Sequence, residues 1–403
     1  MRGTDVPKPL EGIRVLEFGV FIAGPFCGTM LADMGADVIK IEPPEGDMAR
    51  AMPPILSGHS ATFVSLNRNK RSLVLDLKKK EAADIIRALA AKSDVFLENY
   101  RPGVLEKFGL DADAIRKVNP KIVYTSVSGF GQTGPYRRRA AVNLIVEAAS
   151  GTLSVNGEKG EMPMRSGVQN ADMFGALFAT YATLAGLIGV LRHKIGRTAD
   201  VSLVEASIAT AVWETAEYLA VGTVPGQLGH RHRLNAPYQL FETATGRHVA
   251  IGTPNTQLFA KLMATIGLAD HVADPRFATY ASRKANEDAL IDLIEPAMKR
   301  QDPLALEAAL VEQGVPCTLV NNFEEALTNP HITARNVVAS VDHPVMGAIK
   351  TVRNPVLFDQ GGPDLRCAAP VRGQHSADVL REIGYSAAQI AELAAAGVTK
   401  VAS

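Results

Sequence analysis

Short apolar runs alternate with segments of helical spacing over the first 130 residues. The pattern predicts strands at 14–19, 37–42, 72–77, 95–100 and 121–130, and helices at 24–36 and 78–94. Strands rich in Val, Ile and Leu that alternate with helices are typical of a parallel sheet covered on both faces. We therefore predict a doubly wound α/β domain in this part of the chain.

One long segment with almost no charge predicts a single helix at about 171–194. Residues 173–191 are close to the length that crosses a membrane. They also contain Gly175, Gly186 and Gly189, and no second segment of this kind exists. We therefore expect a helix buried in protein and packed closely through small residues. A strand–helix pattern over 199–220 follows it.

The alternation of strand and helix patterns ends near residue 222. A loop-like stretch leads to a predicted hairpin at 242–253, and helical patterns continue to about residue 315. The final runs are too short to form a core alone. We predict a large domain at 1–223, a small α+β domain at 224–330, and a C-terminal segment at 331–403 that returns to the large domain.

Composition narrows the partners and the compartment. The 403 residues contain 42 Lys plus Arg and 42 Asp plus Glu, so no global field recruits nucleic acid or an anionic membrane, and neither partner is expected. Three widely spaced cysteines form no disulfide framework, and the N-terminus lacks the apolar core of a signal peptide. These features favour a cytoplasmic protein.

Common cofactor motifs do not fit the chain. Gly19, Gly24 and Gly28 follow the first predicted strand, but their spacing is wrong for a dinucleotide fingerprint. His230 and His232 are each followed by an arginine, which would repel a metal cation. We therefore expect neither a nicotinamide nor a metal site.

Asp172 is the carboxylate that stands out, because it opens the uncharged helical segment. An Asp in a first helical turn is often only a cap or a partner of the helix dipole. Buried beside a helix N-terminus, an ionised carboxylate would also suit covalent catalysis. Position alone leaves both roles open.

Several long motifs of the chain belong together. They are PLEGIRVLEFG (9–19), AGPFCGTMLADMGADVIKIEPPEGDMAR (23–50), LNRNKRSLVLDLK (66–78), ENYRPGVLEKFGL (98–110), SGFGQTGPY (128–136), IGRTADVSLVEA (195–206) and GQHSADVLREIGY (373–385). Together they resemble the class III coenzyme A transferases, the family of formyl-CoA transferase, carnitine CoA-transferase and the 2-methylacyl-CoA racemases. The resemblance runs nearly from end to end.

The resemblance implies a Rossmann-like large domain, a small domain, and two ring-shaped chains interlinked in a homodimer. It assigns the nucleophile to Asp172, which would attack an acyl-CoA to give a mixed anhydride and then carry CoA as an aspartyl thioester. A free carboxylic acid would take over the CoA. Coenzyme A is then a substrate, and no metal is needed.

The resemblance also assigns the residues that contact CoA. They are Ile22, Ala23, Leu75, Asp76, Lys78, Asn99, Tyr100, Arg101 and Lys107, to which we add Val142 and Asn143. Strand ends in an open α/β sheet form a binding crevice, and Lys and Arg can meet phosphates there.

The chain departs from the family pattern at 137–147. A Tyr-Asp or His-Asp pair and then a Gln usually stand where this chain has Val142, Asn143 and Glu147. Since Val142 cannot move a proton, an acyl-CoA racemase or isomerase is disfavoured. Residues 242–254 carry no glycine run, which disfavours formyl-CoA:oxalate chemistry. We predict a CoA-transferase; a racemase of the same family and a catalytically silent CoA-binding scaffold are the alternatives.

Overall fold

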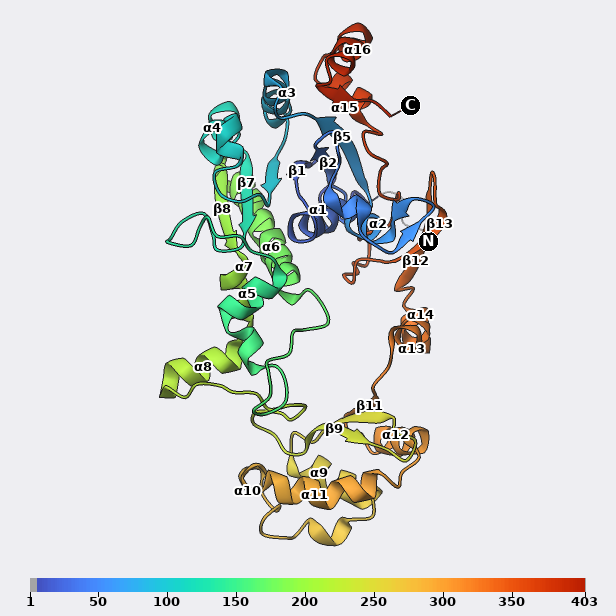
Figure 1. Ribbon diagram of the computed structural model, residues 1–403. Coiled ribbons are helices and arrows are strands. Elements are labelled where there is room, and N and C mark those ends of the chain that lie inside the picture. Colours follow the sequence, from blue (N-terminus) through green and yellow to red (C-terminus); the bar gives the residue numbers. More distant parts are fainter. Residues whose placement is uncertain (1–5, 403) are drawn as a thin grey trace. The chain divides into compact units, whose positions relative to one another are not determined.

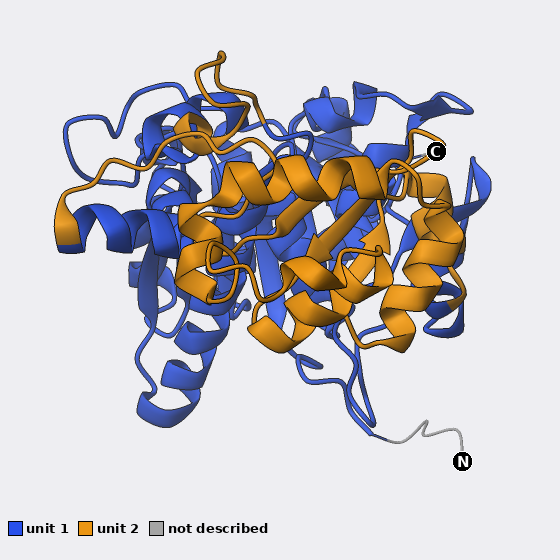
Figure 2. Cartoon of the chain, turned by 90° about the horizontal axis from the view of Figure 1, so that it is seen from below, with its two compact units in different colours: residues 1–152, 166–220, 331–403 blue, residues 153–165, 221–330 orange. Residues whose placement is uncertain are grey.

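The computed structural model describes residues 6–402. These residues form two compact units, coloured separately in Figure 2. Within residues 6–402, unit 1 comprises 6–152, 166–220 and 331–402, and unit 2 comprises 153–165 and 221–330. The predicted boundaries were 223/224 and 330/331. Residues 153–165, which we assigned to the large domain, lie in unit 2.

A seven-stranded sheet organises unit 1 (Figure 1). Its strands are β1 (Arg14–Phe18), β2 (Asp37–Glu42), β5 (Lys70–Leu75), β6 (Val95–Glu98), β7 (Val123–Ser128), β8 (Arg197–Ser202) and β14 (Thr399–Lys400), in the order β14-β5-β2-β1-β6-β7-β8. All neighbouring strands pair in parallel except β14, which runs antiparallel to β5. The predicted parallel sheet is confirmed, and each predicted strand lies within a few residues of its observed bounds.

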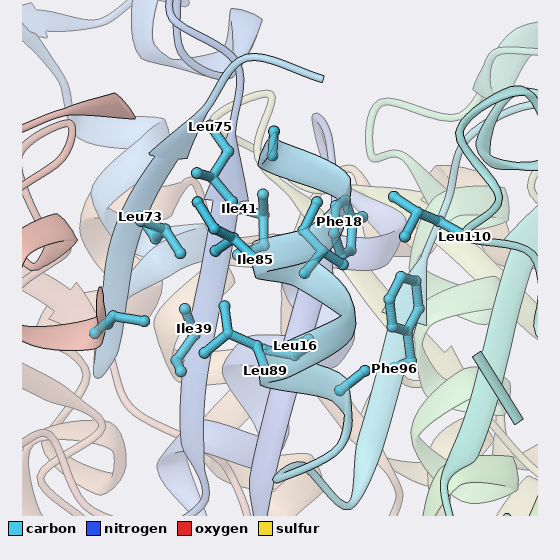
Figure 3. Packing of buried hydrophobic residues seen from close by; sticks show 14 of the residues in the cluster. Leu16, Phe18, Ile39, Ile41, Leu73, Leu75, Ile85, Leu89, Phe96 and Leu110 are labelled. Atoms are coloured by element: carbon cyan, nitrogen blue, oxygen red, sulfur yellow. The ribbon is translucent and has the colours of Figure 1, made fainter. Parts of the chain in front are cut away.

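Alternate residues of the strands point to two separate apolar cores, one on each face of the sheet. Leu16, Ile39 and Phe96 face one core, and Val15 and Val38 face the other. Figure 3 shows the first core, in which Ile85 and Leu89 of α3 (Lys80–Ala90) pack onto the strands. Both faces are therefore covered, which explains why the strands read as nearly continuous apolar runs.

Different helices supply the two cores of unit 1. The core that contains Leu16 is completed by α3 (Lys80–Ala90), α4 (Ala112–Val118), α15 (Ser376–Glu382) and α16 (Ala387–Ala395). The core that contains Val15 is completed by α1 (Ala23–Asp33), α5 (Asn143–Ser150), α6 (Asn170–His193) and α7 (Leu203–Thr210). The C-terminal segment thus adds helices and an edge strand to the sheet of unit 1.

Small residues let α6 lie close to the sheet. A Cβ on Gly175 would come within 2.0 Å of Leu203 Cδ2, and one on Gly186 within 2.7 Å of Val123 Cγ1. The predicted close packing is therefore present. Among the described residues α6 is the one helix long and apolar enough to cross a membrane. Only 39% of its most apolar 18-residue stretch is buried. It is less buried than we expected.

Several short elements of unit 1 do not follow from the sequence pattern. They are η1 (Met48–Ala51), β3 (Ile55–Leu56), β4 (His59–Ser60), α2 (Ala61–Asn67), η2 (Leu105–Phe108), and the hairpin of β12 (Val338–His343) and β13 (Gly347–Val352). The pattern predicts only a loop between β2 and β5, and misses α4 as well. Short elements carry too few apolar positions to show a period.

Unit 2 is a small α+β fold with its own core. The antiparallel strands β9 (Tyr238–Glu242), β10 (His248–Gly252) and β11 (Cys317–Leu319) pack with α9 (Thr256–Thr265), α11 (Glu287–Met298) and α12 (Pro303–Glu312). The elements η3 (Thr152–Val155), η4 (Ala269–His271), α10 (Tyr280–Ala285) and α13 (Phe323–Thr328) complete it, and α8 (Val212–Val221) and α14 (Pro330–Ala334) lie at its boundaries with unit 1. The predicted hairpin is β9–β10.

Candidate active site

The residues that the resemblance assigns to CoA follow parallel strands of unit 1. Ile22 and Ala23 come after β1, Leu75 ends β5, and Asn99 comes directly after β6. The carboxyl ends of parallel strands meet at one edge of the sheet. The chain winds outward from β1 to β2 and β5 and then returns to place β6 on the other side of β1. Such a reversal point is where ligands bind in open α/β sheets.

The loop after β1 is held from two sides. Asn99 Oδ1 accepts from Val20 N at 2.8 Å, and Asn99 Nδ2 donates to Val20 O at 3.0 Å. On the other side, Asp47 Oδ1 accepts from Phe21 N at 3.3 Å. Phe21 has φ 58°, a left-handed conformation that costs a non-glycine residue about 1–3 kcal/mol. These partners hold the loop in a shape that Phe21 would not adopt alone.

A buried ionic network lies beneath this loop. Lys40 Nζ is 3.2 Å from Glu17 Oε1 and 2.9 Å from Asp47 Oδ2, and Lys70 Nζ is 2.6 Å from Glu17 Oε2. Lys40 also donates to Gly19 O at 2.5 Å. Burial lowers the pKa of Lys70 to about 8, against the opposing charge of Glu17. The network ties the end of β1 to β2 and β5, and the sequence pattern does not predict that these charges pair.

Two of the three CoA residues predicted at the end of β5 are engaged within the protein itself. Leu75 is fully buried, main chain included, so this predicted CoA residue is not accessible to a ligand in the structure. Asp76 Oδ1 accepts from Lys78 N at 3.0 Å, which fixes the turn into α3. Lys78 itself is exposed.

Basic side chains gather near the end of β6. Arg101 lines an open cavity of about 520 Å³ together with Arg137, Arg138 and the buried Glu98. Lys107 is exposed on η2. Arg137 and Arg138 therefore share a cavity with Arg101, a predicted CoA residue.

The Glu98 carboxylate shapes the backbone at this strand end. Glu98 Oε2 accepts from Tyr100 N at 2.8 Å. Burial raises the pKa of Glu98 to about 7, and burial also raises the pKa of Tyr100. Tyr100 is thus held by its backbone at the reversal point of the sheet.

The two predicted residues at the start of α5 are placed very differently. Val142 is 66% exposed, whereas Asn143 is buried. Asn143 Nδ2 donates to Glu147 Oε1 at 2.9 Å. Asn143 Oδ1 accepts from Ala171 N at 3.0 Å and from Asp172 N at 3.4 Å. The amide of Asn143 is therefore engaged within the protein, and Glu147, which the sequence marks only as a departure from the family pattern, joins the site.

Asp172 lies in the first turn of α6 and is half-buried. Burial, and secondly the negative charge of Glu147, raise the pKa of Asp172 from 3.8 to about 6. At neutral pH the carboxylate is then ionised, and it is more basic than an ordinary aspartate. Those are the properties of an activated carboxylate nucleophile.

The direction of α6 brings Asp172 to the edge of the sheet where the CoA residues lie. Gly186 lies against Val123 at the start of β7, and a Cβ on Gly175 would lie 3.8 Å from Val127, near the end of β7. The helix therefore runs antiparallel to β7, with its N-terminus at the carboxyl edge of the sheet. Asp172 and the strand ends after β1 and β6 share this edge, all within unit 1.

The histidines weighed as metal ligands have other partners. His230 Nδ1 lies 3.7 Å from Glu158 Oε1, and His232 Nδ1 accepts from the backbone of Leu234 and Asn235. Within residues 6–402 no group of three or more His, Cys, Asp or Glu side chains is arranged to hold a metal ion.

Comparison with known proteins gives a consistent result. Residues 10–376 match the model of CoA-transferase family III. The chain is 36% identical to succinate–glutarate CoA-transferase of Agrobacterium fabrum, covering 94% of this chain and 98% of that protein. It is 34% identical to succinyl-CoA–D-citramalate CoA-transferase of Chloroflexus aurantiacus, covering 95% and 96%.

A solved structure agrees with the sequence relatives. The crystal structure of a CAIB/BAIF family protein from Brucella suis superposes with a TM-score of 0.84 at 33% identity, covering 94% of this chain and all of that one. Both the fold and the long motifs therefore lead to one assignment. The chain belongs to CoA-transferase family III, and its activity is that of a CoA-transferase.

Proposed function

We propose that the enzyme moves CoA from an acyl-CoA to a free carboxylic acid through covalent intermediates on Asp172. The carboxylate attacks the thioester carbonyl carbon, the C–S bond breaks, and CoA leaves as a thiolate. The thiolate then attacks the Asp172 carbonyl of the anhydride and releases the first acid. The acceptor carboxylate and the aspartyl-CoA thioester repeat these steps in reverse order.

The placement of Asp172 carries this proposal. A nucleophile must be ionised yet basic, and a pKa of about 6 meets both needs at neutral pH. The N-terminus of α6 adds a favourable dipole for negative charge at the reacting group. A carboxylate needs no proton transfer to attack a thioester. The reaction is therefore compatible with Val142, whose side chain cannot transfer a proton.

We place CoA at the carboxyl edge of the sheet between β1 and β6. The strand order β5-β2-β1-β6-β7-β8 supports a Rossmann-like interpretation, since it has the same winding as a sheet of two mononucleotide-binding halves. Arg101 and Lys107 would meet the phosphates, and Ile22 and Ala23 would contact the ligand at the start of α1. In this proposal Asn99 acts by shaping the loop at Val20.

The relatives suggest which acyl donor to try first. Two of them are named for succinate or succinyl-CoA and a second dicarboxylic acid. We propose succinyl-CoA as donor and a short dicarboxylic acid as acceptor. A screen of glutarate, citramalate, malate and oxalate would identify the acceptor.

The experiment that tests the covalent route uses Asp172→Asn. An amide cannot form the anhydride, so turnover should be lost while CoA binding remains. Mass spectrometry of wild-type enzyme incubated with succinyl-CoA and quenched with hydroxylamine or borohydride should locate a modification on the peptide that contains Asp172. The adduct should be absent from the variant.

Asp378→Asn is the matched control, because Asp378 is an exposed aspartate in the first turn of α15 in the same unit. It should keep both turnover and the adduct. Full activity in Asp172→Asn would sink the covalent route. CoA binding without exchange toward any acid would favour the silent scaffold.

A second copy of the chain is the proposed partner. Leu177, Tyr181, Ile188 and Leu191 lie on one face of α6 by their spacing, and each is at least 47% exposed. A second copy that covers this face would fit the interlinked homodimer of the family. Sedimentation at nanomolar concentration tests this, because an interlinked dimer cannot dissociate into folded monomers; a reversible native monomer would contradict it.

A further inference from the structure

The pair formed by Asn143 and Glu147 places a negative charge beside the N-terminus of α6. The two side chains are one helical turn apart on α5 and share a hydrogen bond of 2.9 Å. Asn143 passes this link on, because its Oδ1 accepts from the backbone of Ala171 and Asp172. The carboxylate of Glu147 thus connects through one amide to the turn that carries Asp172.

The second carboxylate oxygen of Glu147 is not needed to hold the first turn of α6. Glu147 is 4% exposed, and its Oε2 is buried without a hydrogen-bond partner. Within the described residues Glu147 forms no ion pair with a Lys, Arg or His. An uncompensated buried carboxylate is costly, so a glutamine at this position would make a more stable protein. The charge therefore calls for a functional explanation.

Other charged groups near α6 do not explain the state of Asp172. The elements packed against α6 carry Asp33 of α1, which Arg68 binds, Arg197 and Asp200 of β8, and Glu205 of α7. Apart from burial, Glu147 is the one group that moves the pKa of Asp172.

We propose that Glu147 is a positioning residue for the reaction. Through Asn143 it holds the first turn of α6, and its buried negative charge repels the ionised Asp172 carboxylate and so favours the acylation that neutralises it. This inference rests on the proposed role of Asp172 as nucleophile. The bond that forms joins an Asp172 oxygen to the thioester carbon, and the bond that breaks is C–S. The electron pair leaves on sulfur, so acylated Asp172 is neutral and its repulsion with Glu147 ends.

The direct test is Glu147→Gln, measured as the pH dependence of Asp172 acylation by succinyl-CoA in a single turnover. Gln Oε1 can still accept from Asn143 Nδ2, so the hydrogen bond survives and only the charge is removed. We expect acylation at pH 8 to slow by up to about tenfold with CoA affinity unchanged. We also expect the acid limb of the profile to move down by about one pH unit. Glu392→Gln, an exposed carboxylate on α16, should leave the profile as it is.

A swapped pair separates charge from hydrogen bonding. In Asn143→Asp/Glu147→Gln the glutamine donates to the aspartate, and the aspartate accepts from the helix backbone, so the charge returns next to Asp172. The acid limb should move back toward that of wild type. A purely structural role predicts instead that Glu147→Gln, which keeps the bond, changes neither rate nor profile, and that outcome overturns the inference.

If Glu147→Gln does not fold, carbodiimide labelling of Asp172 in wild-type enzyme can still overturn the inference. The reagent reacts with protonated carboxyls, so labelling should be half-maximal near pH 6. A midpoint near pH 4 would overturn the inference. The two failures differ: without any adduct from succinyl-CoA the proposed function falls and this inference with it, whereas an adduct with an unchanged profile in Glu147→Gln removes this inference alone.

Discussion

Asn99 pairs with the backbone of Val20 in both directions, accepting from its N–H at 2.8 Å and donating to its carbonyl at 3.0 Å. The two residues are 79 positions apart, and their contact joins the loops after β1 and β6. The two reciprocal hydrogen bonds between this side-chain amide and a backbone unit resemble those between paired residues in a β-sheet. Asn99 thus fixes the β1 loop at the point where the sheet order reverses.

Asn99→Asp should weaken CoA binding through this loop. The aspartate can accept from Val20 N but cannot donate to Val20 O, and its charge would face that carbonyl. Losing one hydrogen bond costs about 0.5–1.5 kcal/mol, so we expect CoA affinity to fall by about threefold to tenfold in calorimetry. Hydrogen exchange of residues 19–22 without CoA should rise. Unchanged exchange with weaker CoA binding would mean that Asn99 contacts the ligand instead.

Arg101 and Lys107 should carry the salt-sensitive part of CoA binding. Arg101→Gln or Lys107→Gln removes one charge that can meet a phosphate, which is worth about 1.5–3 kcal/mol or tenfold to a hundredfold in affinity. Titrations at several salt concentrations should also show a shallower salt dependence in each variant. Lys117→Gln, an exposed lysine on α4, is the control of equal charge. Equal affinities in all four proteins would move the CoA site elsewhere.

The sequence predicts the sheet well because its strands are apolar on both faces. It does not reveal the buried charges: Glu17 and Lys40 interrupt predicted apolar strands and Lys70 precedes the strand predicted at 72–77. All three are fully buried, and both lysines pair with Glu17. Their pairing depends on strand neighbours 23 to 53 positions apart (17 to 40 and 17 to 70), which no local pattern contains.

The sequence likewise predicts some residues of the candidate site and not their contacts. The resemblance carried by the long motifs assigns the nucleophile to Asp172, and its place in the first turn of α6 follows from the apolar segment behind it. The partners of Asp172 do not follow, since Asn143 reaches it across 29 positions and Glu147 acts from α5. Asn99 was assigned to CoA by resemblance, while its amide is engaged with Val20. Such roles depend on contacts between elements.

Two glycines of α6 should respond in opposite ways to alanine. A Cβ at Gly186 would lie 2.7 Å and 3.2 Å from the two methyl groups of Val123, so turning the valine relieves nothing. We expect Gly186→Ala to destabilise unit 1 by about 1–3 kcal/mol. At Gly189 the nearest atom is Arg197 Nε at 3.9 Å, and alanine there should stabilise the helix by up to about 1 kcal/mol. Thermal unfolding of both variants tests the close packing of α6, and equal shifts would contradict it.

Glu42 should make the stability of unit 1 depend on acid pH. Arg50 binds both of its oxygens at 2.7 Å, and Ser72 donates to it at 2.7 Å. Burial alone would raise the pKa of Glu42, but the hydrogen bonds and charge of Arg50, with Lys40, outweigh burial and lower it from 4.5 to about 2. A carboxylate with a lowered pKa stabilises the folded state fully above pH 4.5, and this contribution is lost as the pH falls toward 2.

The corresponding variant is Glu42→Gln, compared with wild type in thermal unfolding from pH 7 to pH 3. A shift from 4.5 to about 2 is worth about 3 kcal/mol, so the wild type should exceed the variant most at pH 7. The gap should narrow below pH 4.5, because wild-type Glu42 then loses its advantage over a neutral side chain. Glu392→Gln removes an exposed carboxylate and should show a small gap at every pH. A gap for Glu42→Gln that stays constant down to pH 3 would mean that packing, and not the ion pair with Arg50, is what Glu42 contributes.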